Sequence, residues 1–292
     1  MLLAKVRHED GKVGLAVVED EVLRPLDLTQ APGYHSLSDI LHAEDPIGLT
    51  RYLVDPSGEP MALETVRLLP PVDRQEIWAA GVTYKRSQVA RMEESESGAS
   101  HYDKVYTAPR PELFLKATAE RCVGPADAVR VRYDSRWTVP EPEWTLLISP
   151  DLRIVGHTLG NDMSARDIEG ENPLYLPQAK VYDQSAAVGP WVWLPEEPFD
   201  RRSIELRMRV RRGGETVFEG TTSLGEMART FEELVSWLGR EISFPHGALL
   251  MTGTGIVPDD DFTLLDGDVV FIEADPIGVL TNPVVKREPP EA

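Results

Sequence analysis

Short runs of alternating apolar and polar residues dominate the 292-residue chain and predict a protein built mainly from β-strands. Near the N-terminus, residues 13–28 are typical of a hairpin, because Val13, Leu15 and Val17 alternate and the charged stretch Glu19–Glu21 supplies a turn. Further strands are predicted at Glu76–Gly81, Glu112–Ala117, Val129–Tyr133, Trp144–Ile148, Arg153–Leu159, Trp191–Leu194, Ile204–Arg211 and Val269–Glu273. Most of these runs are separated by Gly or Pro turns, which favours a closed or folded-over sheet over a doubly wound one.

Helical spacing of apolar residues occurs in fewer places. It predicts short helices at Leu37–His42 and Leu49–Val54, and longer ones at Tyr84–Glu96 and Leu224–Leu238. The last helix is expected to end at Gly239, a suitable C-cap. Its apolar residues are expected to face the core rather than a site; they are Met227, Phe231, Leu234 and Leu238.

Proline breaks suggest how the chain divides. Pro56 and Pro60 interrupt the first segment, and Pro70-Pro71 interrupts the chain again, so we place a domain boundary near residue 70. Residues 1–70 then form a small N-terminal domain without a cluster of polar chemistry, and residues 71–292 form the strand-rich catalytic domain. The expected fold class is mainly β with some helix (α+β).

Composition narrows the classes of partner and compartment. The formal net charge is -19 with pI near 4.7, and an acidic surface repels phosphate backbones, so nucleic acid is not an expected partner. Cys122 is the one cysteine; no internal disulfide can form, which fits a reducing cytoplasm, and a buried filler role is expected for it. Neither a signal peptide nor an apolar run of membrane-spanning length is present, so no membrane partner is expected.

Two carboxylates open one of the predicted strands. Glu141 and Glu143 flank Pro142, and residues two apart in a strand share a face, with Cα atoms about 7 Å apart. Like charges on one face repel each other, so both side chains must be well solvated or a cation must lie between them. From these residues alone, a solvated strand end explains the pattern as well as a cation does.

The segment Gly160–Glu169 favours the cation over the solvated strand end, because it supplies a third carboxylate. The strand Ile154–Leu159 leads directly to Asp162, and Ser164 is predicted to cap a short helix that follows. Three carboxylates suit a hard cation such as Mg²⁺, Mn²⁺ or Ca²⁺. The six histidines are scattered without ligand spacing, so zinc is not expected; they lie at positions 8, 35, 42, 101, 157 and 246.

An ordered set of short motifs resembles the fumarylacetoacetate hydrolase superfamily over roughly residues 76–285. The set comprises Glu-x-Glu, Asn-Asp-x-Ser-Ala-Arg-Asp, a lysine, Gly-Pro-Trp-Val, Thr-Gly-Thr and Leu-x-Asp-Gly-Asp, in that order. The resemblance implies a partly rolled mixed β-sheet with a metal in its mouth, a small N-terminal domain, and usually a homodimer. By position it implies that Glu141, Glu143 and Asp162 bind the metal. It also implies that Lys180 is a pocket lysine, that Arg166 lies near the substrate and that Thr254 grips the substrate carboxylate.

The chain departs from the hydrolases of that superfamily in a segment that resembles their lid helix. Those enzymes usually carry a histidine, and often a glutamate, that activate water. Ser87 and Ala90 stand at the corresponding positions, and neither is a base at neutral pH. The family's Thr-Gly-Thr-Pro also reads Thr-Gly-Thr-Gly here. Hydrolysis of a carbon–carbon bond is therefore disfavoured.

A different branch, the 2-keto-3-deoxy sugar-acid dehydratases, is the better match. The resemblance lies in Arg110–Phe114, in the Gly81-Val82-Thr83-Tyr84 start and in Glu171–Lys180. It implies metal-dependent dehydration of a pentonate to 2-oxoglutarate semialdehyde through a metal-stabilised enolate. Lys180 and Glu112 are the candidate acid and base, in an order that the sequence leaves open. Lys85 and Ser87 are expected to bind substrate within a lid formed by residues 85–106.

Each of these residues also has a simpler interpretation. Lys180 and Glu112 could be ordinary surface and strand-edge charges, Arg166 could pair with Asp167 or Glu169, and Thr254 could be a turn residue. Two other functions stay open. The first is an acylpyruvate-type hydrolase or an oxaloacetate decarboxylase on the same metal site. The second is a non-catalytic protein that binds ligands on the same fold.

Overall fold

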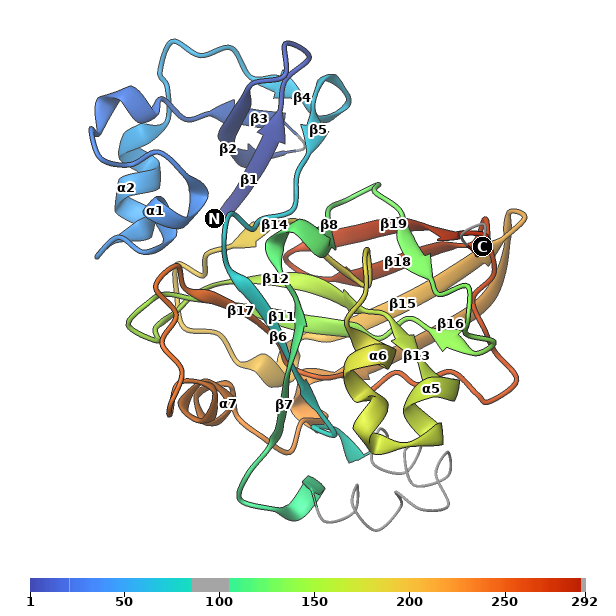
Figure 1. Cartoon of the computed structure of the whole chain (residues 1–292). Coiled ribbons are helices and arrows are strands. Elements are labelled where there is room, and N and C mark those ends of the chain that lie inside the picture. The colour runs from blue at the N-terminus through green and yellow to red at the C-terminus, as the bar shows by residue number, and fades with distance from the viewer. Residues whose placement is uncertain (21, 86–104, 290–292) are drawn as a thin grey trace.

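β-Strands dominate the computed structural model, which describes residues 1–20, 22–85 and 105–289 (Figure 1). The larger sheet has the order β4-β3-β2-β1-β14-β12-β11-β17-β6-β7, with β5 paired to β1 and β8 paired to β14. Its strands are β1 (Leu2–Arg7), β2 (Val13–Glu19), β3 (Val22–Pro25), β4 (Met61–Ala62), β5 (Arg67–Leu68), β6 (Glu76–Gly81), β7 (Glu112–Ala117), β8 (Cys122–Val123), β11 (Pro142–Ile148), β12 (Ile154–Asp162), β14 (Ala186–Trp193) and β17 (Ala248–Met251). This mixed, folded-over sheet confirms the predicted fold class.

A second sheet packs against the first. Its order is β16-β15-β18-β19-β9, and a two-stranded ribbon pairs β10 with β13. The bounds are β9 (Val129–Val131), β10 (Thr138–Val139), β13 (Ser164–Ala165), β15 (Glu205–Arg212), β16 (Glu215–Ser223), β18 (Val269–Ala274) and β19 (Gly278–Lys286). Met208 and Ile272 of this sheet share a core with Trp144 and Leu146 of β11. The alternate residues of β15 and β18 therefore cover one face of β11.

The other face of β11 is covered as well. Leu147 follows Leu146 but belongs to a separate core, which it shares with Leu37 and Ile40 of helix α1. Successive side chains of a strand point to opposite faces, so a strand between two cores is buried on both faces. Every residue of β11 is buried, as this position requires. The helices are α1 (Leu37–Leu41), α2 (Pro46–Leu53), α5 (Arg166–Glu171), α6 (Leu176–Lys180) and α7 (Phe231–Leu238).

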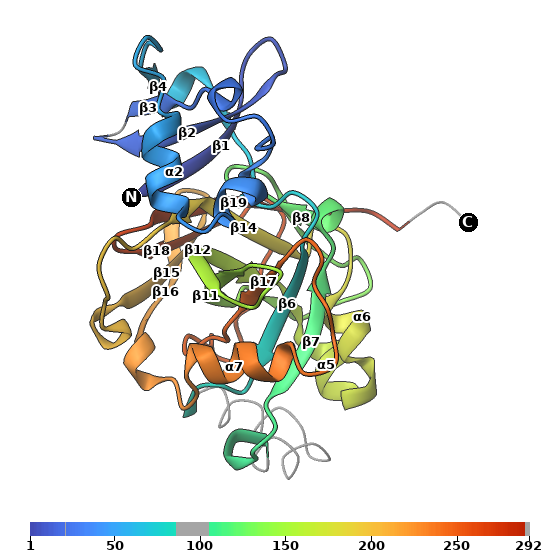
Figure 2. The same cartoon turned by 90° about the vertical axis from the view of Figure 1, so that its left-hand side faces the viewer.

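The N-terminal strands extend the larger sheet outward (Figure 2). β1 pairs with β14 through Leu2 and Leu3, so the sheet is continuous between the two parts of the chain. β2 and β3 pair antiparallel, which confirms the hairpin, and α1 and α2 confirm the two short helices. Helix α2 begins earlier than predicted because Asp45 caps it and Pro46 occupies its first turn. The domain boundary near residue 70 stays a prediction.

The prediction of one helix over Leu224–Leu238 is wrong. A 3-10 turn covers Leu224–Glu226, Met227 is extended, and α7 begins at Phe231. Thr230 ends the irregular stretch because its side chain accepts a hydrogen bond from the Glu233 amide, as an N-cap does. The predicted C-cap at Gly239 is confirmed, and the apolar face is buried as expected. Of the predicted helix Tyr84–Glu96, residues 86–96 lie outside the described residues.

Nine of the described strands have no counterpart among the predictions: β1, β4, β5, β8, β10, β13, β16, β17 and β19. The remaining short elements are the 3-10 turns η1 (Leu28–Gln30), η2 (Leu63–Thr65), η3 (Ala119–Arg121), η4 (Pro173–Tyr175), η5 (Arg201–Ser203) and η6 (Leu224–Glu226). No helix in the described part of the chain is long and apolar enough to cross a membrane.

Candidate metal centre and active site

Three carboxylates meet where β11 begins and β12 ends. The two strands pair antiparallel with Pro142 opposite Asn161, and the Asp162 amide donates a hydrogen bond to the Glu141 carbonyl oxygen at 2.9 Å. This register places Asp162 directly beside Glu141, while Glu143 shares the face of Glu141. One carboxylate oxygen from each residue lies within 4.8 Å of the others, and all three side chains are buried. Among the described residues, these three form the one such group of potential metal ligands.

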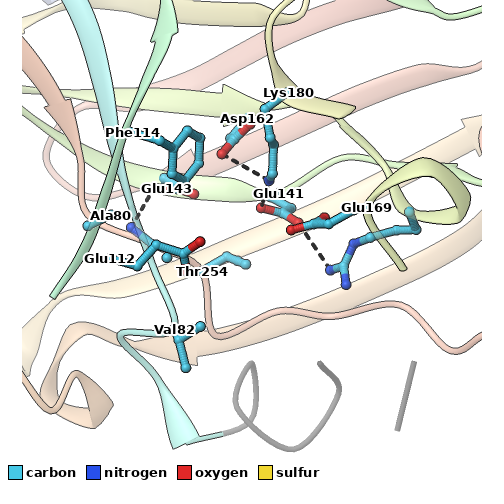
Figure 3. Close-up of a pocket in the computed structure, with 13 residues that line it drawn as sticks. Ala80, Val82, Glu112, Phe114, Glu141, Glu143, Asp162, Glu169, Lys180 and Thr254 are labelled. Atoms are coloured by element: carbon cyan, nitrogen blue, oxygen red, sulfur yellow. Dashed lines mark hydrogen bonds and ion pairs between the residues drawn. The ribbon is translucent and has the colours of Figure 1, made fainter. Parts of the chain in front are cut away.

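Cations surround two of the three carboxylates. Lys180 Nζ lies 2.7 Å from Glu141 Oε2 and 3.1 Å from Asp162 Oδ2, and Arg166 Nη2 lies 3.1 Å from Glu141 Oε1 (Figure 3). Lys180 and Arg166 are almost completely buried. The alternative of a surface lysine is therefore wrong. The ion pair of Arg166 is with Glu141 and not with Asp167, while the alternative of a pair with Glu169 stays a prediction. Asp167 instead accepts hydrogen bonds from the Ser135 hydroxyl and the Arg136 amide.

Glu143 has a different environment. Its Oε2 accepts a 2.5 Å hydrogen bond from the Gly253 amide, which follows β17. Gly253 has φ +94, and a Cβ atom there would lie 2.0 Å from Thr83 Oγ1, so this turn requires glycine. Burial, and then the carboxylates of Asp162 and Glu141, hold the pKa of Glu143 well above its usual range. A cation among the three carboxylates would oppose that shift, because it favours the ionised form.

A pocket opens over the carboxylates. Glu112 and Phe114 of β7 line it together with Arg166, Lys180 and Thr254; the remaining lining residues are Ala80, Gly81, Val82, Glu141, Glu143, Asp162, Glu169 and Gly253. Glu112 reaches the pocket because it lies over Gly81, where a Cβ atom would come within 2.1 Å of Glu112 Oε2. Val82 follows with φ +52, a conformation that a β-branched residue rarely adopts and that marks local strain.

The other predicted site residues have mixed outcomes. Thr254 lines the pocket, and its hydroxyl also accepts a hydrogen bond from the Ile256 amide at 3.1 Å. Lys85 is exposed and is not among the lining residues. Ser87 and most of the predicted lid lie outside the described residues. Ser164 is not the predicted helix cap: it lies in β13, and its hydroxyl donates to Glu169 Oε2 at 3.0 Å.

Sequence reasoning missed Lys116, Phe114 and Glu169. Lys116 has no exposed surface, and its Nζ lies 2.7 Å from Asp162 Oδ1. Burial, opposed by the Asp162 carboxylate, lowers the pKa of Lys116. The alternation of β7 carries the missing signal, because Glu112, Phe114 and Lys116 occupy every second position and so share one face.

Two residue types that often mark other chemistries are structural here. Cys122 is buried, and burial raises the pKa of its thiol to about 12, so it is no nucleophile. His157 is buried in an aromatic cluster away from the carboxylates, where its Nδ1 accepts a 3.0 Å hydrogen bond from the Trp144 indole. Both findings agree with the filler and structural roles expected for them.

Three buried carboxylates, two buried lysines and a pocket are thus brought together. Comparison with known proteins identifies the family of this chain. The family model "Fumarylacetoacetate (FAA) hydrolase C-terminal" matches residues 76–285. The chain belongs to this family.

Named relatives narrow the picture within the family. The chain is 50% identical to a "Probable 2-keto-3-deoxyxylonate dehydratase" of Haloferax volcanii, over 73% of each chain. It is 41% identical to the 2-dehydro-3-deoxy-D-arabinonate dehydratase of Saccharolobus solfataricus, over 77% of this chain and 76% of the relative. A solved structure described as 2-keto-3-deoxy-D-arabinonate dehydratase complexed with magnesium and 2,5-dioxopentanoate superposes with TM-score 0.83. It is 33% identical, over 99% of this chain and 100% of that one.

Proposed function

We propose that the protein is a Mg²⁺-dependent lyase that dehydrates a 2-keto-3-deoxy pentonate to 2-oxoglutarate semialdehyde. The observation that carries the proposal is the single pocket in which Glu112 and Lys180 face the three carboxylates. The two relatives named as dehydratases supply the substrate class. Without Glu112, the pocket could still bind a metal, but it would lack a second residue to carry a proton during the removal of water.

The carboxylates fit a divalent cation. Glu141, Glu143 and Asp162 offer oxygen ligands from three buried side chains, and such ligands suit Mg²⁺, with Mn²⁺ or Ca²⁺ as substitutes. Burial, and then the carboxylates of Asp162 and Glu141, raise the pKa of Glu143, and a bound divalent cation would favour its ionised form. When bound, Mg²⁺ would polarise the C2 carbonyl of the keto acid.

Residues of the chain would carry the protons and orient the substrate. Dehydration removes one proton from C3 and the hydroxyl from C4, which leave together as water, and a C3=C4 double bond conjugated with the C2 carbonyl remains. Transfer of one proton from C5 to C3 and of the C5 hydroxyl proton to C4 then gives the C5 aldehyde. No oxidant is required. We assign the two proton transfers of the elimination, removal from C3 and donation to the leaving hydroxyl, to Glu112 and Lys180, without deciding which residue takes the C3 proton. Arg166 and Thr254 would hold the substrate carboxylate, and Lys85 and Ser87 stay candidate contacts from the lid.

The names of the relatives bear on stereochemistry. In a 2-keto-3-deoxy pentonate, C2 is a carbonyl and C3 carries two hydrogens, so C4 is the one remaining stereocentre. Pentonates that differ only at C2 or C3 therefore give the same substrate, and the enzyme has to distinguish only the two C4 enantiomers. Both enantiomers belong in the first assay.

A coupled assay tests the proposal. Purified protein is incubated with each enantiomer of 2-keto-3-deoxypentonate and Mg²⁺, and an aldehyde dehydrogenase reports the semialdehyde. We expect a signal that EDTA abolishes and Mg²⁺ restores. The variant E112Q, which keeps the shape of the side chain but cannot carry a proton, should lose at least tenfold in kcat while still binding Mg²⁺. The proposal would be contradicted if metal-loaded protein were inactive on both enantiomers but turned over acylpyruvates or oxaloacetate.

We further propose that the enzyme acts in the cytoplasm as a homodimer or dimer-based oligomer and takes a small 2-keto acid as its partner. The family resemblance supports the oligomeric state, and the single buried Cys122 is compatible with a reducing compartment. Light scattering coupled to size-exclusion chromatography tests the first point, since a monomer would elute at 32.5 kDa.

A further inference from the structure

A fully buried lysine lies behind the metal centre. Lys116 occupies the fifth position of β7, which is the edge strand of the larger sheet next to β6. Its side chain has no exposed surface, although lysine is among the residues least often buried. Taking an ammonium group out of water costs several kcal/mol, so its neighbours must offset that cost.

Three groups from two segments surround the ammonium of Lys116. Its Nζ lies 2.7 Å from Asp162 Oδ1, and it donates to the carbonyl oxygen of Met163 at 2.8 Å and to that of Lys180 at 2.6 Å. Asp162 ends β12, Met163 follows it, and Lys180 is the last residue of α6. One ammonium group thus forms an ion pair with a proposed metal ligand and donates hydrogen bonds to the main chain of the next residue and of the proposed catalytic lysine.

The contact with Asp162 divides that carboxylate between two lysines. Lys116 holds Oδ1, while Oδ2 lies 3.1 Å from Lys180 Nζ. A carboxylate that is gripped at one oxygen cannot rotate freely, so the second oxygen keeps its direction toward the centre.

The same strand supports Lys180 at a second point. Phe114 lies on the face of β7 that carries Lys116, and the Lys180 ammonium lies 5.6 Å from the centre of its ring. A cation over an aromatic ring is attracted by the electron-rich face. β7 therefore fixes Lys180 at its main chain through Lys116 and at its ammonium through Phe114.

We propose that Lys116 is a positioning residue that sets the geometry of both the metal ligand Asp162 and the lysine Lys180. It does not line the pocket and touches no reacting atom, so it acts through these two residues. The part that concerns Lys180 rests on the proposed function, whereas the part that concerns Asp162 rests on metal binding alone.

Metal titration separates positioning from a general structural role. In K116M the side chain keeps its length but loses its charge and its donors. We expect the Kd for Mg²⁺ measured by calorimetry, and the Kd for Mn²⁺ measured by electron paramagnetic resonance, to rise by about 10–100-fold. We also expect kcat to fall more than KM changes.

A neighbouring variant supplies the control. Leu115 lies next to Lys116 on the opposite face of β7, so L115A weakens the same strand without touching the site. L115A should lower the melting temperature and leave the Kd for Mg²⁺ unchanged. If K116M does not fold, K116Q, which is shorter and uncharged but retains amide donors, replaces it with the same expected rise in Kd.

A folded K116M or K116Q with a Kd for Mg²⁺ within twofold of the wild type would overturn the inference. The titration contains no substrate, so its outcome is independent of the proposed reaction. Loss of Mg²⁺ affinity in K116M together with a wild-type enzyme that is inactive on pentonates would retain Lys116 as a positioning residue for the metal and reject the dehydratase.

Discussion

At the scale of single residues, the three carboxylates of the centre are not equivalent. Both oxygens of Asp162 and both of Glu141 contact cationic side chains, whereas Glu143 receives a hydrogen bond from a backbone amide. A backbone amide offers less compensation than a full charge, which explains why burial and its neighbours raise the pKa of Glu143. Glu143 is therefore the proposed ligand whose ionisation would depend most on a cation.

This difference predicts an unusual stability pattern for E143Q. The amide removes the charge that is crowded in the metal-free protein, so the unfolding free energy without metal should stay within about 1 kcal/mol of the wild type or exceed it. Mg²⁺ at a hundred times its Kd should stabilise the wild type by about 2.7 kcal/mol, and E143Q should lose this increment together with its activity. Thermal melts with and without Mg²⁺ measure both effects. An unchanged Mg²⁺-induced shift in E143Q would show that Glu143 is not a ligand.

Gly81 offers a test of Glu112 that leaves Glu112 itself intact. The Cβ atom of G81A would meet the Glu112 carboxylate, the mobile end of a flexible side chain, so the carboxylate should move while the fold tolerates the change. We expect kcat to fall at least tenfold, with little change in melting temperature or in the Kd for Mg²⁺. Steady-state kinetics and calorimetry check this, and full activity in G81A would argue against a proton-transfer role for Glu112.

At the scale of elements, strands with a local sequence signal were predicted better than strands that depend on a partner distant in the chain. β6 and β7 match their predicted bounds, because alternation and flanking turns are contained within each segment. β17 was missed because its four residues are apolar without alternation. It pairs in parallel with β6, about 170 positions earlier in the chain, and no local signal reports such a partner. Lys116 was missed for a related reason: its partners Asp162 and Lys180 come from β12 and α6.

The wrong start of α7 leads to a prediction about its cap. Thr230 stands three residues before Glu233, and its hydroxyl accepts the Glu233 amide at 3.1 Å. T230A should lower the unfolding free energy by about 1 kcal/mol, whereas T230S, which keeps the hydroxyl, should stay close to the wild type. Urea denaturation measures the difference. Equal losses in both variants would mean that the threonine methyl, and not the cap, stabilises the start of α7.

At the scale of the whole molecule, the fold places the site at the mouth of two packed sheets. The proposed metal ligands come from the paired ends of β11 and β12, which are central strands of the larger sheet and lie between two cores. Glu112 and Lys116 enter from the edge strand β7, and Thr254 follows β17. The sequence motifs selected three carboxylates that the structure brings together, and pairing between distant strands supplies the pocket that joins them. The geometry of the site therefore depends on the packing of both sheets.

That sandwich contains a titratable group whose protonation should limit stability in acid. His157 lies in β12 against Trp144, Trp193 and Phe199, and burial lowers its pKa to about 3. In the unfolded chain a histidine has a pKa near 6.5. The unfolded state therefore binds an extra proton between these two values. The contribution of neutral His157 is complete above about pH 6.5 and is lost progressively as the pH falls toward 3.

We expect the unfolding free energy of the wild type to fall, relative to that of H157Q, by about 1 kcal/mol per pH unit between pH 6 and pH 4. H157Q is the matched control, because its amide oxygen can still accept the Trp144 indole hydrogen bond but does not titrate. Urea denaturation at pH 7, 6, 5 and 4 gives both curves. Parallel curves would mean that His157 stays neutral in the unfolded chain as well or becomes protonated without unfolding. Convergence of the two curves at low pH would assign this part of the acid sensitivity to one side chain in the core, independent of the metal centre.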